Sequence, residues 1–231
     1  MLQSWRWFGE HDPISLNQIF QTGVKGIVSA LHACEKNKPW PESLIHELKQ
    51  NIEANGFKWT VVESVPVHEA IKLNNADAPY YIEIYKETIR RLARAGIKTI
   101  CYNFMPIIDW TRTDLLYELP TGGSALRFDM VQFICYDVCI LKRKNATNNY
   151  PEGLVLKAKE YFKTLSNSEQ LLLEKNIIAG LPGADFSFSR DDVIGLIMQY
   201  DGVSEAQLRR NLVSFLKEII PVAKAVGVNI A

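Results

Sequence analysis

Four times in this chain a predicted helix is followed by glycine, an apolar residue, Lys or Asn, and then an apolar run typical of a β-strand. The four instances begin at Gly23, Gly56, Gly96 and Gly227. Glycine ends a helix at little cost by adopting the left-handed backbone conformation, and the apolar residue after it packs back on the last turn. Repeated transitions of this kind are typical of alternating β and α units, which form parallel sheets.

The strand-like runs are rich in β-branched residues and nearly continuous in hydrophobicity. They lie at Ile27-Val28, Thr60-Val61-Val62 and Thr99-Ile100-Cys101, with an earlier run at 5–8 and a last one at 228–231. Continuous apolar runs are typical of parallel strands that are covered on both faces. The chain therefore predicts about five parallel strands, arranged either as a doubly wound layer or as a barrel.

Helical periodicity separates the strand-like runs. A helix beginning near Pro41 places four apolar residues on one face: Leu44, Ile45, Leu48 and Ile52. Near the end of the chain, Ser204 and Gln207 predict a capping box at the start of a long helix. Pro221 is expected to kink or interrupt that helix, because proline lacks the backbone N–H that an inner turn needs.

From about residue 105 to 203 the strand pattern is interrupted. Helices are predicted at 129–142, 153–165, 168–175 and 189–200, joined by turn-rich connectors at 119–124 and 180–183. So long a segment inside a compact domain is not expected to be an unstructured loop. We expect a largely helical cap inserted after the fourth strand, within one domain that spans residues 1–231.

Composition and motifs argue against several classes of protein. The 26 Lys and Arg balance 26 Asp and Glu, so the chain lacks the basic excess typical of nucleic-acid binding. It has neither an apolar run of about 18 residues nor a secretory leader, so no membrane partner is expected. The four cysteines are too few and too irregular for a disulfide framework, which favours a cytoplasmic location with reduced thiols. Nucleotide-binding glycine motifs and a nucleophile elbow are absent.

Polar and aromatic side chains follow the predicted strands where each strand ends. They are Arg6 with Trp7, His32, Glu63 and Asn103. Parallel β/α folds bind ligands at the carboxyl ends of their strands, and this set of groups suits a small, polyhydroxylated, anionic ligand. Arg112 lies in a polar segment after the fourth strand, at the start of the predicted cap. We expect its guanidinium to bind the carboxylate of the ligand.

Several motifs in this order resemble the mannonate dehydratase family, over essentially all 231 residues. They are Trp5-Arg6-Trp7-Phe8-Gly9, Ala30-Leu31-His32, the run 61–69, Cys101-Tyr102-Asn103-Phe104-Met105-Pro106, Asp109-Trp110-Thr111-Arg112-Thr113-Asp114, the run 125–129, the run 176–183 and the run 219–223. The resemblance implies a TIM-type (β/α)8 barrel of the xylose-isomerase-like superfamily. It also implies a lyase that converts D-mannonate to 2-keto-3-deoxy-D-gluconate and water in hexuronate breakdown, using Fe2+ or Mn2+.

The resemblance places the family's metal ligands and its acid/base tyrosine beyond Ala231, the last residue of this chain. No metal ligand and no catalytic residue is therefore assigned here. A closed barrel needs eight strands, whereas about five are predicted, so the chain is expected to be the amino-terminal part of an incomplete barrel. We expect it to be inactive by itself and to self-associate through the unpaired edges of the strands at 5–8 and 228–231. A homo-oligomer is also compatible with the sequence.

Two alternatives remain open. Another metal-dependent sugar isomerase or epimerase of the same barrel superfamily would share strand-end His, Glu and Asn residues. The second alternative is that the chain is a catalytically inert, truncated remnant. The unassigned metal ligands favour this interpretation.

Overall fold

The computed structural model describes the whole chain except residues 1, 33, 36, 108–110 and 180–188. Its described residues form two compact units. The first unit comprises residues 2–106 and 200–231, and the second comprises residues 107–179 and 189–199, less the gaps just given. Each unit has its own hydrophobic core. The Asp109-Trp110 and Gly180-Leu181-Pro182-Gly183 parts of the family motifs lie outside the described residues.

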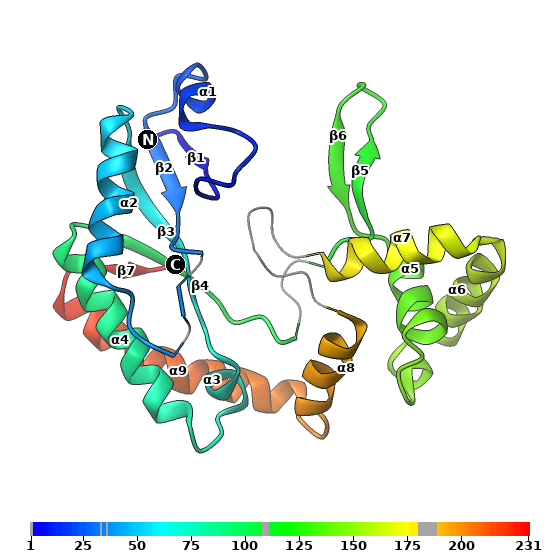
Figure 1. Ribbon diagram of the computed structural model, residues 1–231. Coiled ribbons are helices and arrows are strands. Elements are labelled where there is room, and N and C mark those ends of the chain that lie inside the picture. The colour runs from blue at the N-terminus through cyan, green and yellow to red at the C-terminus, as the bar shows by residue number, and fades with distance from the viewer. Residues whose placement is uncertain (1, 33, 36, 108–110, 180–188) are drawn as a thin grey trace. The chain divides into compact units, whose positions relative to one another are not determined.

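The first unit contains a five-stranded parallel sheet in the order β1-β2-β3-β4-β7 (Figure 1). The strands are β1 (Ser4–Arg6), β2 (Gly26–Ser29), β3 (Lys58–Pro66), β4 (Thr99–Asn103) and β7 (Asn229–Ile230). Both the number of strands and their parallel arrangement are confirmed. The strands lie side by side in chain order, without the reversal that marks a doubly wound sheet. This is the order found in a β/α barrel.

The last strand, β7, is shorter than the predicted run at 228–231, but its pairing with β4 continues through Ala231. The Ala231 backbone N–H donates to the carbonyl of Ile100 at 3.0 Å, and the Ala231 carbonyl accepts from the Tyr102 N–H at 3.1 Å. Ala231 therefore serves the sheet through its backbone alone, and its methyl side chain brings no functional group to the strand ends.

Figure 1 shows the three longest helices of the first unit along one side of this sheet. The helices of the unit are α1 (Leu16–Phe20), α2 (Glu42–Ala54), α3 (Glu69–Leu73), α4 (Ala78–Arg94) and α9 (Glu205–Ala225). Gly23, Gly56, Gly96 and Gly227 all have positive φ angles, so the repeated glycine does follow the helices in the left-handed conformation.

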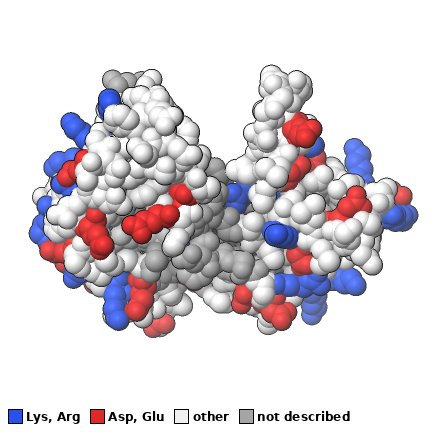
Figure 2. Space-filling model, turned by 45° about the horizontal axis from the view of Figure 1, so that its top comes forward, with Lys and Arg blue, Asp and Glu red and all other residues white. Residues whose placement is uncertain are grey.

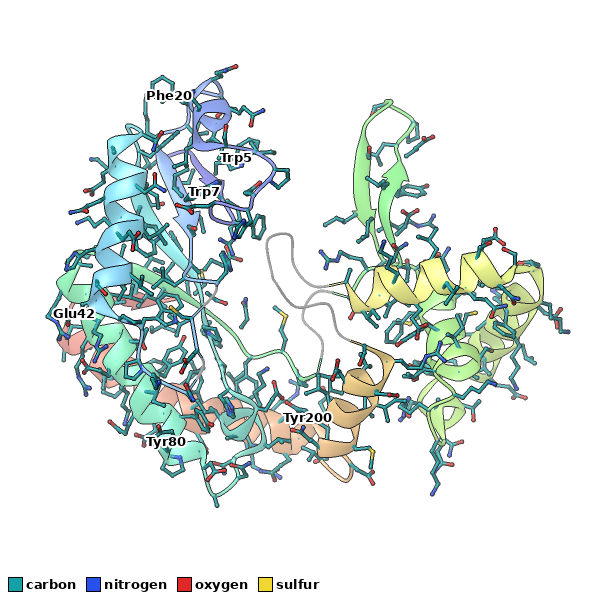
Figure 3. The ribbon with its side chains drawn as sticks, viewed as in Figure 1. Trp5, Trp7, Phe20, Glu42, Tyr80 and Tyr200 are labelled. Atoms are coloured by element: carbon teal, nitrogen blue, oxygen red, sulfur yellow. The ribbon has the colours of Figure 1, made fainter. Side chains whose placement is uncertain are left out.

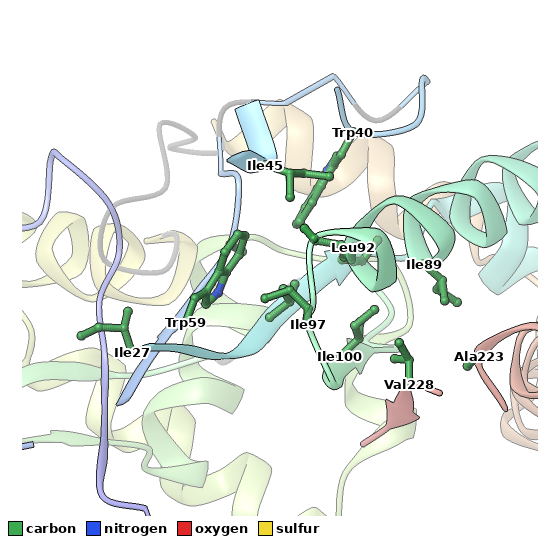
Figure 4. Close-up of a cluster of buried hydrophobic side chains, with 14 of the residues drawn as sticks. Ile27, Trp40, Ile45, Trp59, Ile89, Leu92, Ile97, Ile100, Ala223 and Val228 are labelled. Carbon is green, nitrogen blue, oxygen red and sulfur yellow. The ribbon is translucent and has the colours of Figure 1, made fainter. Parts of the chain in front are cut away.

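The core of the first unit lies between the sheet and these helices. Ile27, Trp59 and Ile100 on the strands are buried together with Ile45 of α2 and Leu92 of α4 (Figure 4). Successive side chains of a strand point to opposite faces of the sheet. The strand residues between the core positions therefore face away from the helices, and they include Arg6, Glu63, Cys101 and Asn103, all half-buried.

Helix α9 differs from its prediction in two respects. Pro221 lies inside the continuous helix, so it does not interrupt it. Burial of Phe215, Ile219 and Ala223 on one face of α9 outweighs the loss of one backbone hydrogen bond. Ser204 does accept a hydrogen bond from the Gln207 backbone N–H, at 3.2 Å, but the Gln207 side chain donates to Asn211 instead of completing the box.

The second unit begins with an antiparallel hairpin formed by β5 (Asp114–Glu118) and β6 (Ser124–Arg127). Helices follow it: α5 (Met130–Cys135) and a π-helical turn (Tyr136–Ile140), a 3-10 turn (Ala146–Asn149), α6 (Glu152–Thr164), α7 (Asn167–Ile178) and α8 (Arg190–Gln199). The largely helical character after the fourth strand is confirmed. The hairpin was not predicted, because adjacent leucines at 115 and 116 hide the alternation that marks a strand.

Acidic and basic side chains are interspersed on the visible surface of each unit (Figure 2). Within the part of the chain that the structure describes, no helix is both long enough and apolar enough to cross a membrane.

Candidate functional site

The carboxyl ends of β1, β3 and β4 bring three of the predicted site residues to the face of the sheet opposite α2, α4 and α9. Arg6 ends β1, Glu63 lies in the second half of β3, and Asn103 ends β4. Because these strands are parallel and follow one another in chain order, their carboxyl ends share one edge of the sheet. The three side chains therefore belong to one strand-end cluster.

Arg6 and Glu63 form the charged pair of this cluster. Arg6 Nε lies 3.8 Å from Glu63 Oε2, and the exposed fractions of the two side chains are 22% and 36%. The guanidinium also lies over the Phe8 ring, 4.5 Å from its centroid, and Nη1 donates to the carbonyls of Trp7 and Val28. Burial lowers the pKa of Arg6 from its ordinary value, and Glu63 opposes that shift. Among the described residues none accepts a hydrogen bond from Arg6 Nη2, so this group can bind an anionic ligand.

Cys101 is a member of the cluster that the sequence did not single out. Burial raises the pKa of its thiol, Glu63 raises that pKa further, and Arg6 lowers it. These electrostatic effects place the Cys101 thiol in the field of the Arg6–Glu63 pair. The available signal was its position in β4, two residues before Asn103 and so on the same face of the strand.

Asn103 and His32 complete the polar groups at the strand ends. Asn103 Nδ2 donates to Ser64 Oγ at 3.0 Å, which orients the amide beside β3. His32 is half-buried in the loop after β2, and its ring centroid lies 6.0 Å from that of Phe8. The Phe8 ring therefore neighbours both the imidazole of His32 and the guanidinium of Arg6.

The other two predicted residues have different surroundings. Trp7 is 4% exposed and belongs to the hydrophobic core beside β2, where Ser29 Oγ donates to its carbonyl oxygen at 2.8 Å (Figure 3). Arg112 belongs to the second unit, where it is 6% exposed and Nη2 donates to the carbonyl of Ala179 at 3.2 Å. The structure thus groups Arg6, Glu63 and Asn103 with His32 nearby, and it buries Trp7 and Arg112.

The donor groups present do not fit the Fe2+ or Mn2+ that the resemblance implies. Within the described residues, no group of three or more His, Cys, Asp or Glu side chains is placed to hold a metal ion. A catalytic transition-metal site needs about three protein ligands with nitrogen, oxygen or sulfur donors. The strand-end cluster provides a single carboxylate, that of Glu63, beside the Arg6 guanidinium. That the acid/base tyrosine lies beyond Ala231 stays a prediction, and no catalytic residue is assigned within residues 1–231.

A parallel sheet whose strands follow one another in chain order defines a β/α protein of the barrel type. The family model described as D-mannonate dehydratase (UxuA) matches residues 1–231. The chain therefore belongs to the mannonate dehydratase family.

Individual relatives agree with this assignment. The chain is 49% identical over 230 residues to mannonate dehydratase 2 of Agrobacterium fabrum, covering 100% of this chain and 58% of that protein. It is 46% identical over 228 residues to the mannonate dehydratase of Saccharophagus degradans, covering 99% of this chain and 57% of that protein. The crystal structure of mannonate dehydratase from Streptococcus suis serotype 2 superposes with a TM-score of 0.70 at 32% identity. That match covers 100% of this chain and 52% of the other, so the chain spans little more than half the length of these relatives.

Proposed function

We propose that this chain is part of an enzyme that dehydrates D-mannonate to 2-keto-3-deoxy-D-gluconate in hexuronate catabolism. Membership of the family supports this reaction. The observation that carries the proposal is the Arg6–Glu63 pair, which presents a guanidinium and a carboxylate at the strand ends where β/α proteins bind ligands. A sugar acid offers both a carboxylate and hydroxyl groups to such a pair.

In this proposal the cluster binds and orients the sugar acid. Arg6 binds the substrate carboxylate through charge-assisted hydrogen bonds, while Glu63 accepts hydrogen bonds from substrate hydroxyls. Asn103 and His32 bind further hydroxyls, and Trp7 supports Arg6 from the core through its carbonyl oxygen. The reaction removes the C2 proton and releases the C3 hydroxyl as water, and the resulting enol becomes the 2-keto acid. Arg6 would stabilise the negative charge that develops near the carboxylate as the C2 proton leaves.

We further propose that the reaction needs Fe2+ or Mn2+ held by groups other than the described residues. The donor set of the strand-end cluster, with its single carboxylate, supports this proposal. The isolated chain is accordingly expected to lack dehydratase activity. The four free cysteines support a cytoplasmic location.

Binding of D-mannonate to the isolated chain tests the role of the cluster. Isothermal titration should detect weak binding that falls by about tenfold or more in Arg6→Gln, since a charge-assisted hydrogen bond is lost. Arg90→Gln is the matched control, because Arg90 pairs with Glu87 on the surface of α4, remote from the strand ends. Equal binding by wild type and Arg6→Gln would contradict the proposal, and tighter binding of aldoses than of D-mannonate would favour the isomerase alternative.

Activity is tested in a chimera that joins this chain to the remaining part of the Agrobacterium fabrum relative. With Mn2+, a folded chimera should form 2-keto-3-deoxy-D-gluconate, whereas the isolated chain should not. A folded, metal-binding chimera without activity would support the inert-remnant alternative. Activity of the isolated chain would show that the proposed need for other ligands is wrong.

We also propose that the isolated chain self-associates. In the sheet order, β1 and β7 are the outermost strands, and an outer strand edge is a template for pairing with another copy. Leu116 and Leu126 of the hairpin are 75% and 53% exposed and add apolar surface in the second unit. Size-exclusion chromatography should show species larger than a monomer, and a sharp monomer peak at all concentrations would contradict this proposal.

A further inference from the structure

Lys72, in the short helix α3, is a buried lysine whose ammonium group has two oxygen partners. The residue is 8% exposed. Its Nζ lies 2.5 Å from Glu69 Oε1 and donates to the Met105 carbonyl at 2.8 Å. Met105 comes two residues after Asn103, so Lys72 holds the backbone directly beyond the end of β4.

Glu69 connects this lysine to a distant part of the chain. Its second carboxylate oxygen accepts a hydrogen bond from the Tyr200 hydroxyl, and Tyr200 is 9% exposed. Tyr200 is the residue at which the chain re-enters the first unit after the second (Figure 3). Met105 lies immediately before the point at which the chain leaves the first unit.

Helix α3 is itself tied to α9. Asn211 Nδ2 donates to the Lys72 carbonyl at 2.8 Å, and Gln207 Nε2 donates to Asn211 Oδ1 at 2.7 Å. Asn211 is 2% exposed, so this contact is shielded from water. The Lys72–Glu69 pair is therefore carried by an element that is fixed to the rest of the first unit.

We propose that Lys72, Glu69 and Tyr200 are positioning residues that hold together the two ends of the 107–199 segment. We name this arrangement the base clamp. Through the Met105 carbonyl it fixes the backbone after β4, and thereby the orientation of Asn103 at the strand ends. The consequence for sugar-acid binding rests on the proposed function, whereas the clamp itself does not.

The chemistry of the clamp favours positioning over stability. Removing the Lys72 ammonium group from water costs much of what its attraction to Glu69 gains, so the pair adds little net stability compared with apolar residues. The buried lysine does demand specific partners, because its charge would be costly if it were unpaired. The partner of Lys72 is the carbonyl of Met105, just before the 107–199 segment begins. The partner of Glu69 is the hydroxyl of Tyr200, just after that segment ends.

Hydrogen–deuterium exchange on the full chain tests the clamp. Tyr200→Phe removes only the hydroxyl that donates to Glu69. Amide exchange should nevertheless accelerate by about tenfold both at 200–203 and at 104–107, the two ends that the clamp joins. The double variant Lys72→Met with Glu69→Gln, which leaves no unpaired charge, should give the same pattern. Exchange in α2 and β2 should stay unchanged in both variants. Acceleration confined to 200–203 in Tyr200→Phe would overturn the proposal, because a purely local contact gives that result.

Lys86→Met is the matched control. Lys86 also pairs with a glutamate three residues earlier, Glu83, and with a distant group, Glu218 of α9, and its side chain is similarly covered. Its loss should accelerate exchange in α4 and α9 but leave 104–107 unchanged. The same acceleration at 104–107 in Lys86→Met would also overturn the proposal, because it would reflect general loosening of the first unit.

D-mannonate titration of the same variants separates the clamp from the proposed function. If the clamp orients Asn103, Tyr200→Phe should weaken binding while the melting temperature changes little. Coupled exchange at both ends with no D-mannonate binding in any variant would uphold the clamp and contradict the proposed function. D-mannonate binding without coupled exchange would contradict the clamp and uphold the proposed function.

Discussion

Ser4 Oγ of β1 lies 3.4 Å from Thr60 Oγ1 of β3, although β2 separates the two strands. The contact is possible because Gly26, the first residue of β2, has no side chain to fill the space. A Cβ added to Gly26 would lie 2.2 Å from Ser4 Oγ and 2.9 Å from Thr60 Cγ2. Gly26 is thus required because it lets three strands approach closely. The backbone conformation does not require glycine there, since the φ angle of Gly26 is not positive.

Gly26→Ala is expected to destabilise the first unit by about 1–3 kcal/mol, because an inserted methyl group forces neighbouring atoms apart. Gly153→Ala is the control, since a Cβ at Gly153 in α6 meets no atom within 4 Å. That change should stabilise the helix by about 0.5–1 kcal/mol. Urea denaturation of both variants provides the comparison, and a Gly26→Ala protein as stable as wild type would show that the strands can separate without cost.

The Asp137 carboxylate is expected to be essential to the second unit. It is 4% exposed, pairs with Arg143 at 2.8 and 2.6 Å, and accepts a hydrogen bond from the Tyr150 hydroxyl at 2.7 Å. Asp137→Asn should destabilise the unit by about 1–3 kcal/mol, because the hydrogen bonds of the Arg143 guanidinium lose their charged acceptor. Glu160→Gln, which breaks an exposed pair with Lys163, should cost about 1 kcal/mol or less. Thermal melts that rank the two variants in the other order would contradict this.

The Ser166–Glu169 capping box predicts a pH dependence at the start of α7. The Ser166 hydroxyl and backbone N–H donate to Glu169 Oε2 and lower the pKa of that carboxyl group. Since the folded pKa is the lower one, this stabilisation is complete above the unfolded pKa and is lost as the pH falls through the folded pKa. In Ser166→Ala the pKa of Glu169 should rise toward its ordinary value, as followed by NMR titration.

Asp192 provides the internal control for that titration. Ser189 donates to it in the same way and lowers its pKa at the start of α8. The pKa of Asp192 should not change in Ser166→Ala. Equal upward shifts at both carboxyl groups would mean that the substitution acts on the whole fold.

Alkylation of Cys101 reports on the geometry of the strand-end cluster. Because Glu63 raises the pKa of the Cys101 thiol and Arg6 lowers it, Glu63→Gln should speed alkylation by iodoacetamide near pH 8, and Arg6→Gln should slow it. Peptide mass spectrometry separates Cys101 from Cys139 of the second unit. The pKa of Cys139 is raised by burial and depends on neither residue, so its alkylation rate should stay constant. Identical Cys101 rates in both variants would place the thiol outside the cluster.

Local patterns in the sequence determined the elements that build this fold. Gly23, Gly56 and Gly96 ended helices as predicted, since a left-handed residue needs no distant partner. The apolar face of α2 was predictable in part, because it depends on residues within a few turns: Ile45 and Ile52 are buried, whereas Leu44 is 40% exposed. The family motifs were also carried by the sequence, and the comparisons confirm what they implied about family membership.

Only the tertiary structure decided which side chains meet. Arg6 reaches Glu63 across β2 because of strand order and of a register shift between β2 and β3, and neither is encoded in a short stretch of sequence. The continuity of α9 through Pro221 depends on burial against the core, which outweighs the local preference of proline. Lys72 reads in sequence as a surface lysine, and it is buried because Glu69 and the Met105 carbonyl converge on its ammonium group from separate parts of the fold. Contacts between residues far apart in the chain depend on strand order, register and packing, which short-range preferences do not specify.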